Sequence, residues 1–213
     1  MADESLADLL GGRRAALDAT APVAGFLAGW LTTGHSIAWG SAAAVLVAVV
    51  VAAWRLHRGD RPGAVLIGLL GVSVAALIAL RTGRAEDFFL LRLLTNGASA
   101  LAWAISIVIR WPLLGLVVGG ILGQRTMWRR DPALLSAYQK GSWVWVCQYV
   151  LRLAVFLPLY AAGQVVALGV AQIALTYPLI AVVIAASWWL IRRSLPPNHP
   201  GLRHPQLPEK AVT

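Results

Sequence analysis

Long apolar stretches follow one another along almost the whole chain, separated by short polar links. A helix needs about 20 mainly apolar residues to cross the hydrocarbon core of a bilayer, and several stretches approach that length. Of the 213 residues, 59% are hydrophobic and 13% charged, whereas a soluble domain has about 45–50% apolar and about 25% charged residues. We therefore predict an all-α fold, a polytopic bundle of transmembrane helices, and exclude soluble enzymes and nucleic-acid-binding domains.

The apolar stretches divide the chain into three regions. We expect a cytoplasmic amphipathic lead-in over residues 1–21, a transmembrane helical domain over 22–193 and a Pro-rich cytoplasmic tail over 194–213. A further run of ten apolar residues, 113–122, is too short to span and predicts a re-entrant or interfacial segment. About six spans remain, at 22–33, 37–54, 62–80, 88–109, 143–162 and 176–191.

Basic residues determine the predicted orientation. They concentrate in the links RLHRGDR and QRTMWRRDP and in the tail, and cytoplasmic links carry the excess of Lys and Arg in membrane proteins. If residues 113–122 enter and leave on one side, both links and both termini face the cytoplasm. We therefore expect a multi-pass protein of the bacterial inner (cytoplasmic) membrane, and the net charge of +9 indicates loop bias rather than binding of nucleic acid.

Ten tryptophans support a membrane location, because Trp is enriched at membrane interfaces. Trp103, Trp143 and Trp145 lie deeper inside predicted spans than the others. Seven lie near predicted span ends, where we expect aromatic belts: Trp30, Trp39, Trp54, Trp111, Trp128, Trp188 and Trp189.

Polar side chains inside two spans form stripes. In the span 88–109 the polar or large residues recur at steps of three or four, which places them on one helical face: Arg92, Asn96, Ser99, Trp103, Ser106 and Arg110. The span 143–162 has a similar set, namely Trp145, Gln148, Arg152 and Tyr160. Charged and polar groups are expensive inside a membrane, so they indicate either a functional site or contacts that hold helices together.

The carboxylates Glu86 and Asp87 begin the span 88–109, within the motif RTGRAEDFF. They are the natural partners for Arg92 and Arg152, and we take them as candidate catalytic residues. The candidate substrate-binding residues are Phe88, Phe89, Arg92, Asn96, Trp103, Trp145, Gln148, Arg152 and Tyr160. The scattered histidines and the single Cys147 predict neither a metal site nor a cofactor.

Three functions remain open. An acid-initiated terpenoid cyclase or isomerase would use a neutral carboxylic acid and aromatic faces on a lipid-soluble isoprenoid ligand. An ion or small-solute channel or transporter would use the arginines and the re-entrant segment. An envelope or septation-associated scaffold would use neither, and the stripes would then be structural. The expected partner is the lipid bilayer rather than nucleic acid, and assembly as a homo-oligomer stays open.

Several segments resemble a known family. They are GGRRAALDATAP, RTGRAEDFFLLRLLTNGASALAWAISIVIRWPLLG, WRRDP, and LRLAVFLPLY followed by PLIAV. In this order they resemble the actinobacterial integral-membrane domain-of-unknown-function family 3159, from about Gly11 to Arg193. The rhythm of spans and the WRR-containing link are also similar to the septation protein A family. The resemblance implies an inner-membrane protein and transfers no catalytic residue.

Overall fold

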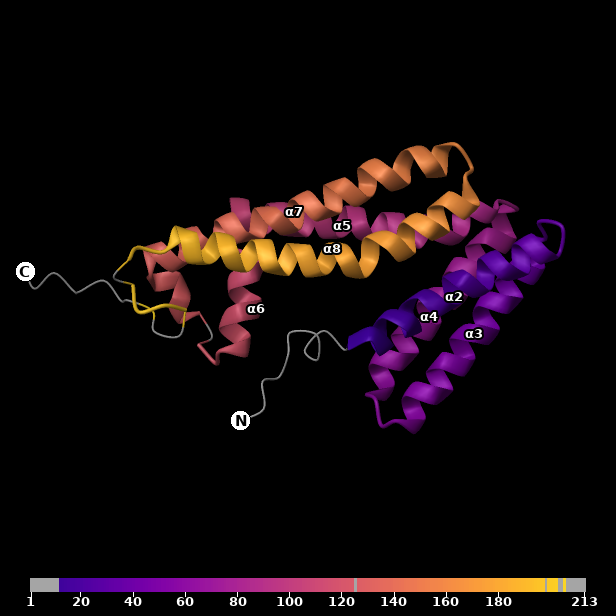
Figure 1. The fold of residues 1–213 in the computed structure, drawn as a ribbon, viewed down its shortest axis with the longest axis horizontal. Coiled ribbons are helices and arrows are strands. Elements are labelled where there is room, and N and C mark those ends of the chain that lie inside the picture. The colour runs from indigo at the N-terminus through magenta and orange to yellow at the C-terminus, as the bar shows by residue number, and fades with distance from the viewer. Residues whose placement is uncertain (1–11, 125, 198, 203–204, 206–213) are drawn as a thin grey trace, which may run out of the picture. The chain divides into compact units, whose positions relative to one another are not determined.

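The computed structural model of the protein is described here for residues 12–124, 126–197, 199–202 and 205 (Figure 1). Residues 1–11 of the predicted lead-in and residues 198, 203–204 and 206–213 of the predicted tail lie outside these ranges. Within it the ordered elements are all helical, which confirms the predicted fold class. They are α2 (Gly12–Thr32), α3 (Ile37–His57), α4 (Pro62–Thr82), η1 (Ala85–Phe89), α5 (Leu90–Val108), α6 (Leu113–Ile121), η2 (Met127–Arg130), α7 (Pro132–Ala161) and α8 (Val165–Ser194).

Five candidate membrane spans are found among the described residues. They are α3, α4, the continuous stretch of η1 and α5, α7, and α8. The helix α2 occupies the place of the first predicted span but is not one of these five. The protein is therefore a multi-pass membrane protein by the length and composition of its helices.

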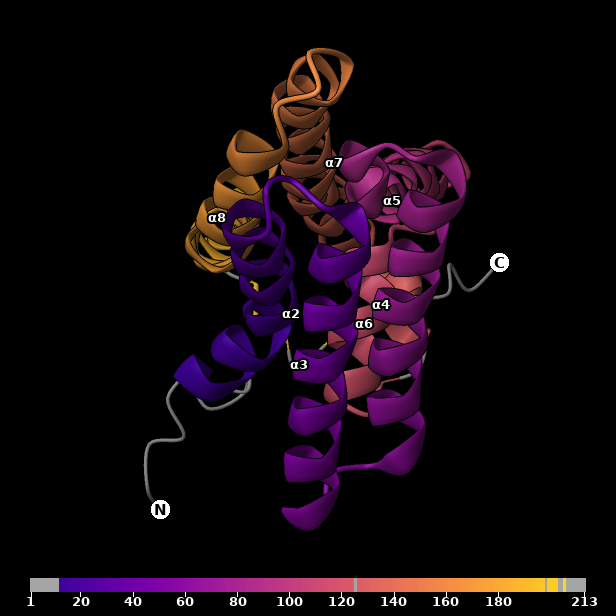
Figure 2. The ribbon, with the colours of Figure 1, turned by 90° about the vertical axis from the view of Figure 1, so that its right-hand side faces the viewer.

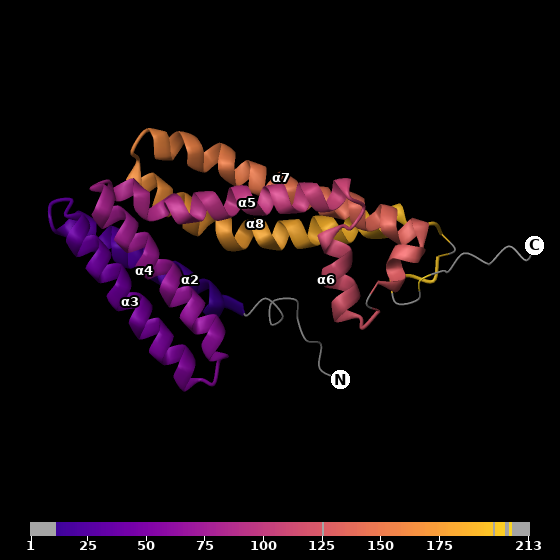
Figure 3. The same cartoon turned by 180° about the vertical axis from the view of Figure 1, so that it is seen from behind.

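The short apolar run forms a short helix. With nine residues, α6 is about 13 Å long, well below the roughly 30 Å of a hydrocarbon core. Pro112 precedes it, and Gly123 follows with a left-handed φ of 68°. Figure 3 shows α6 connected to the end of α5. This length agrees with the prediction that residues 113–122 do not cross the membrane.

The last two helices are longer than their predicted spans. The helix α7 begins at Pro132 because Asp131 caps it, its Oδ1 atom accepting hydrogen bonds from the amides of Ala133 (3.0 Å) and Leu134 (3.2 Å). The expected link at 163–175 is mostly helix, because α8 begins at Val165 directly after a turn. Hydropathy identifies only the apolar part of a helix, and α7 and α8 extend beyond their apolar parts.

The chain forms two compact units. The first unit contains residues up to 94 and residues 155–177, and the second contains 95–154 and 178 onward. The boundaries fall inside α5, α7 and α8, so each of these helices contributes a segment to both units.

In the first unit, α2, α3 and α4 lie side by side (Figure 2). Glycines let α2 and α3 approach closely: a Cβ added to Gly29 would lie 2.7 Å from the carbonyl oxygen of Trp39 and 2.8 Å from the Cβ of Ala43. The buried core contains stacked Phe26 and Phe88, with ring centroids 4.1 Å apart. The core of the first unit therefore combines small residues, where α2 and α3 touch, with packed aromatic rings.

In the second unit the core lies around Trp128 of η2, which is fully buried. Its ring contacts Tyr138 edge-on at 5.5 Å, and a Cβ on Gly115 would come within 2.7 Å of it. The prediction that Trp128 belongs to an aromatic belt is therefore wrong. The missing side chain of Gly115 leaves room for this indole ring inside the protein.

The exposed surface is strongly apolar, as expected for helices that face lipid. On α5 the exposed residues lie opposite the polar stripe: Leu94, Leu101, Ile105 and Val108. Asn96 and Ser106, in the stripe itself, are buried. This burial agrees with the prediction that the stripe occupies one helical face: its middle residues point inward and the opposite apolar face points outward, while Arg110 at the end of the stripe is exposed. Trp39, Trp54, Trp188 and Trp189 are exposed, as the belt prediction requires.

Candidate functional site

Four side chains of the first unit form a polar group, here called the carboxylate group: Arg84, Glu86, Asp87 and Tyr160. The Nε atom of Arg84 donates to the Oε1 atom of Glu86 at 2.8 Å, forming an ion pair. The hydroxyl of Tyr160 donates to the Oδ1 atom of Asp87. Asp87 is only 4% exposed, so one of the two predicted catalytic carboxylates is buried.

Tight turns place these residues together. Gly83 ends α4 with a left-handed φ of 70°, and its amide donates to the carbonyl of Ala79 at 3.0 Å. The chain then enters η1, which carries Glu86 and Asp87. Gly163, with a φ of 63°, ends α7 beside them, since a Cβ there would lie 3.9 Å from the Oε1 atom of Glu86. The turn before α8 therefore lies next to the carboxylate group.

The environment of Arg84 stabilises its protonated, positively charged form. Its hydrogen bond with Glu86 and the negative charges of Glu86 and Asp87 raise the pKa of Arg84 above its ordinary value. Its guanidinium carbon also lies 5.7 Å from the ring centroid of Tyr160. Arg84 itself is exposed, so this ion pair fixes geometry and charge more than it stabilises the fold.

Aromatic residues adjoin the carboxylate group. Phe88 and Phe89 follow Asp87 directly and are 6% and 2% exposed. Their rings meet edge-on at 5.5 Å, and both contact Phe26 of α2. Phe156 of α7 belongs to the same core cluster. A buried carboxylate thus borders an apolar, aromatic environment.

The arginine partner of Glu86 is not one that the sequence predicted. Arg92 is half-buried, and its Nη2 atom donates to the Oγ1 atom of Thr176 on α8 at 3.4 Å. Glu86 instead pairs with Arg84, which lies two residues before it in RTGRAEDFF. That proximity in sequence is a local signal for the pair, and an argument limited to arginines inside spans does not reach Arg84.

Other predicted site residues lie in the second unit. Asn96, Gln148 and Arg152 are buried there, at 4%, 3% and 6% exposure. Trp103 and Trp145 stack with ring centroids 4.9 Å apart and planes 6° apart. The guanidinium carbon of Arg152 lies 5.9 Å from the ring centroid of Tyr149. Arg152 is thus buried, and its pairing with one of the carboxylates Glu86 and Asp87 stays a prediction.

Among the described residues of the second unit, several side chains have a buried polar atom without a hydrogen-bond partner, and five of them are here called the polar seam. The atoms are Asn96 Nδ2, Ser142 Oγ, Trp145 Nε1, Gln148 Oε1 and Ser187 Oγ. A buried polar atom of this kind is costly unless water or a ligand satisfies it. The seam therefore has unused hydrogen-bonding capacity on α5, α7 and α8.

The predicted site residues fall into two sets. The first unit contains Glu86, Asp87, Phe88, Phe89, Arg92 and Tyr160, of which Asp87 and Tyr160 are in direct contact. The second unit contains Asn96, Trp103, Trp145, Gln148 and Arg152. That all eleven act as a single site stays a prediction.

The helices and the buried polar groups together define an integral membrane protein of the all-helical class. The model of one family matches residues 10–198, nearly the whole chain, and is described as a protein of unknown function (DUF3159). The chain belongs to this family. No curated protein and no solved structure shows a significant match to it.

Proposed function

We propose that the protein is an integral membrane enzyme in which Asp87 acts as an acid on a lipid-soluble isoprenoid substrate. The observation that carries this proposal is the environment of Asp87, a buried carboxyl whose hydrogen bond comes from the neutral hydroxyl of Tyr160. Among the described residues the ion pair of this group joins Arg84 to Glu86 instead. Asp87 is also the more deeply buried of the two carboxylates and directly precedes the buried rings of Phe88 and Phe89. The geometry therefore favours Asp87 over Glu86 as the acid.

The reaction would begin with proton transfer to an alkene. The O–H bond of Asp87 breaks as the proton forms a C–H bond with one alkene carbon, and the other carbon becomes a carbocation. A second double bond of the same molecule closes a ring, and proton loss to the Asp87 carboxylate restores the acid. The faces of Phe88 and Phe89 are suited to stabilise positive charge, because aromatic rings attract cations. Tyr160 would position the carboxyl.

The proposal includes a location. We place the protein in the bacterial inner membrane with α2 as a sixth crossing and both termini in the cytoplasm, because the basic links at 55–61 and 124–131 would then share that side. The link between α4 and α5, which carries the carboxylate group, would face outward. A lipid-soluble substrate would reach Asp87 laterally from the bilayer.

The test measures deuterium transfer from solvent. Membranes containing the full-length protein are incubated in D2O with linear polyprenyl substrates of increasing length, and products are examined by mass spectrometry. We expect a product with one added deuterium from the wild type and none from Asp87→Asn. Asp60→Asn is the matched control, because Asp60 is a carboxylate of the same unit that is ion-paired with Arg55 at 2.8 Å. Equal product from wild type and Asp87→Asn would refute the proposal.

Transport of an ion or small solute is the second candidate, favoured by the polar seam of the second unit. Its unpartnered atoms would be satisfied by water or by a passing solute. Solute flux into proteoliposomes should then fall in Gln148→Leu, and no isoprenoid product should form. If neither product nor flux is measured for the folded wild type, both candidates fail and a scaffolding role remains.

A further inference from the structure

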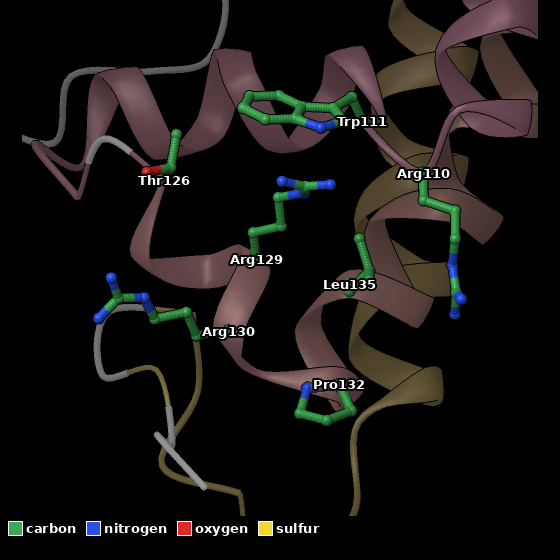
Figure 4. A pocket seen from close by; sticks show the side chains of 7 residues that line it. All are labelled: Arg110, Trp111, Thr126, Arg129, Arg130, Pro132 and Leu135. Atoms are coloured by element: carbon green, nitrogen blue, oxygen red, sulfur yellow. The ribbon is translucent and has the colours of Figure 1, made fainter.

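We infer that the second unit contains a binding pocket for a phosphate-bearing anion, at the junction of α5, η2 and α7. A cavity of about 560 Å³ opens there (Figure 4). It is lined by Arg110, Trp111, Thr126, Arg129, Arg130, Pro132 and Leu135. These residues are separate from the carboxylate group and from the polar seam, so the inference does not depend on the proposed function.

The lining is strongly cationic. Three of its seven residues are arginines and none is a carboxylate. The nearest acid in sequence, Asp131, is 1% exposed and directed into the protein, where its Oδ2 atom lies 2.9 Å from the Nε2 atom of His199. In the described part of the chain, none of Arg110, Arg129 and Arg130 takes part in an ion pair. Among the residues that the structure describes, no carboxylate is paired with the positive charge of the pocket.

Local backbone structure holds two of these residues in place. Arg110 has a left-handed φ of 57°, a conformation that residues other than glycine rarely adopt. Its amide donates to the carbonyl of Ile107, and the amide of Trp111 donates to that of Ser106. These bonds end α5 and turn Arg110 and Trp111 toward η2. An arginine at a position that favours glycine is consistent with a role for its side chain.

Buried Trp128 anchors the other side of the pocket. It fixes η2 on the core of the second unit, and the next two residues, Arg129 and Arg130, are exposed. The guanidinium carbon of Arg129 lies 4.1 Å from the ring centroid of Trp111, a cation–π contact across the cavity. Figure 4 shows Arg129 facing Trp111, with Arg110 and Arg130 farther out on either side and their guanidinium groups directed away from Arg129. An anion in the cavity would be attracted by the positive charges of the arginines that line it.

The chemistry of the lining indicates the ligand class. Guanidinium groups match the geometry of phosphate oxygens and bind them with paired, charge-assisted hydrogen bonds. The volume is typical of ligand pockets, at about 300–1,000 Å³, and exceeds what a bare phosphate ion needs. Trp111, Pro132 and Leu135 offer apolar surface to whatever carries the phosphate. A phospholipid headgroup and a soluble phosphate ester share this chemistry.

The experiment measures binding by isothermal titration to the full-length protein in neutral detergent. The probes are short-chain phosphatidylglycerol, phosphatidylcholine with the same chains, glycerol phosphate and inorganic phosphate. Binding of phosphatidylglycerol alone would identify a lipid headgroup as the source, and binding of glycerol phosphate as well would identify a soluble phosphate ester. Either result supports the pocket, whereas no binding of any phosphate probe, or equal binding of both lipids, overturns it.

Variants assign the binding to the pocket. We expect Arg129→Gln and Arg130→Gln each to weaken phosphate binding about tenfold or more, since a hydrogen bond to a charged group contributes about 1.5–3 kcal/mol. Arg129→Lys should restore part of the affinity by restoring the charge. The matched control is Arg58→Gln, because Arg58 also lies over a tryptophan, Trp54, at 4.4 Å but outside the pocket. If folded Arg129→Gln and Arg130→Gln bind as the wild type does, or if the control loses as much affinity, the inference is wrong.

Discussion

The close contact between α2 and α3 predicts that a Gly→Ala substitution lowers stability at the contact but not at a glycine outside it. Gly29→Ala and Gly71→Ala both add one methyl group to a half-buried glycine inside a helix of the first unit. At Gly29 the new Cβ would lie 2.7 Å from the backbone oxygen of Trp39 and 3.1 Å from the Cα of Gly40. A Cβ added to Gly71 would have no heavy atom of another part of the protein within 4 Å. We expect Gly29→Ala to destabilise the protein and Gly71→Ala to stabilise it or leave it unchanged.

The magnitude follows from two opposing terms. Alanine is favoured over glycine within a helix by about 1 kcal/mol, and this term is the same for both variants. Overpacking a tight contact costs about 1–3 kcal/mol, and it applies to Gly29 alone, where the obstacles are backbone atoms that cannot rotate away. The free energy of unfolding of the two variants should therefore differ by about 1–3 kcal/mol.

Thermal unfolding in neutral detergent, followed by loss of the monodisperse peak, measures this difference. For a chain of this size, 1 kcal/mol corresponds to about 2–4 °C in the midpoint, so Gly29→Ala should unfold several degrees below Gly71→Ala. The comparison uses one detergent and one heating rate, because unfolding of membrane proteins is often irreversible. A midpoint for Gly29→Ala equal to or above that of Gly71→Ala would show that the close α2–α3 contact is absent.

Three further predictions concern burial, capping and topology. Arg152→Leu should lower the free energy of unfolding by about 3–5 kcal/mol, because removal of one member of a buried charged contact leaves its partner unsatisfied; an unchanged midpoint would show that Arg152 makes no such contact. Asp131→Ala should lower it by about 1–2 kcal/mol through loss of the α7 cap alone, and Asp131→Asn, which retains capping ability, should lower it less. With Cys147 replaced by alanine, a cysteine at exposed Met127 should react with an impermeant thiol reagent only in inverted vesicles, and labelling in intact cells would overturn the predicted orientation.

The sequence was sufficient to predict the membrane fold and the orientation of the α5 stripe. Both follow from simple physics: a span needs about 20 apolar residues, and a step of three or four places residues on one face. Asn96 and Ser106 are accordingly buried while Leu101 is exposed. The apolar run predicts a later start for α7 than the structure has, because the helix begins before its apolar part; Asp131 and Pro132 form the capping signal that marks the true start.

The contacts of the site were harder to predict. The hydrogen bond between Asp87 and Tyr160 joins residues 73 positions apart, and only the tertiary fold determines it. The ion pair of Arg84 depends on the left-handed turn at Gly83, which a helical-face argument does not consider. Trp128 is buried because Gly115 leaves space for it, a complementarity that neither residue indicates alone.

The carboxylate group and the basic pocket can be tested for independence by measuring each variant in the assay of the other. They belong to different units, and the proposal for one does not require the other. We therefore expect Arg129→Gln to lose phosphatidylglycerol binding and to leave both kcat and KM for a polyprenyl substrate unchanged. Asp87→Asn should lose turnover and bind phosphatidylglycerol as the wild type does. A rise in KM in Arg129→Gln would show that the arginine contributes uniform binding of the reacting substrate, and independence of the two groups would then be refuted.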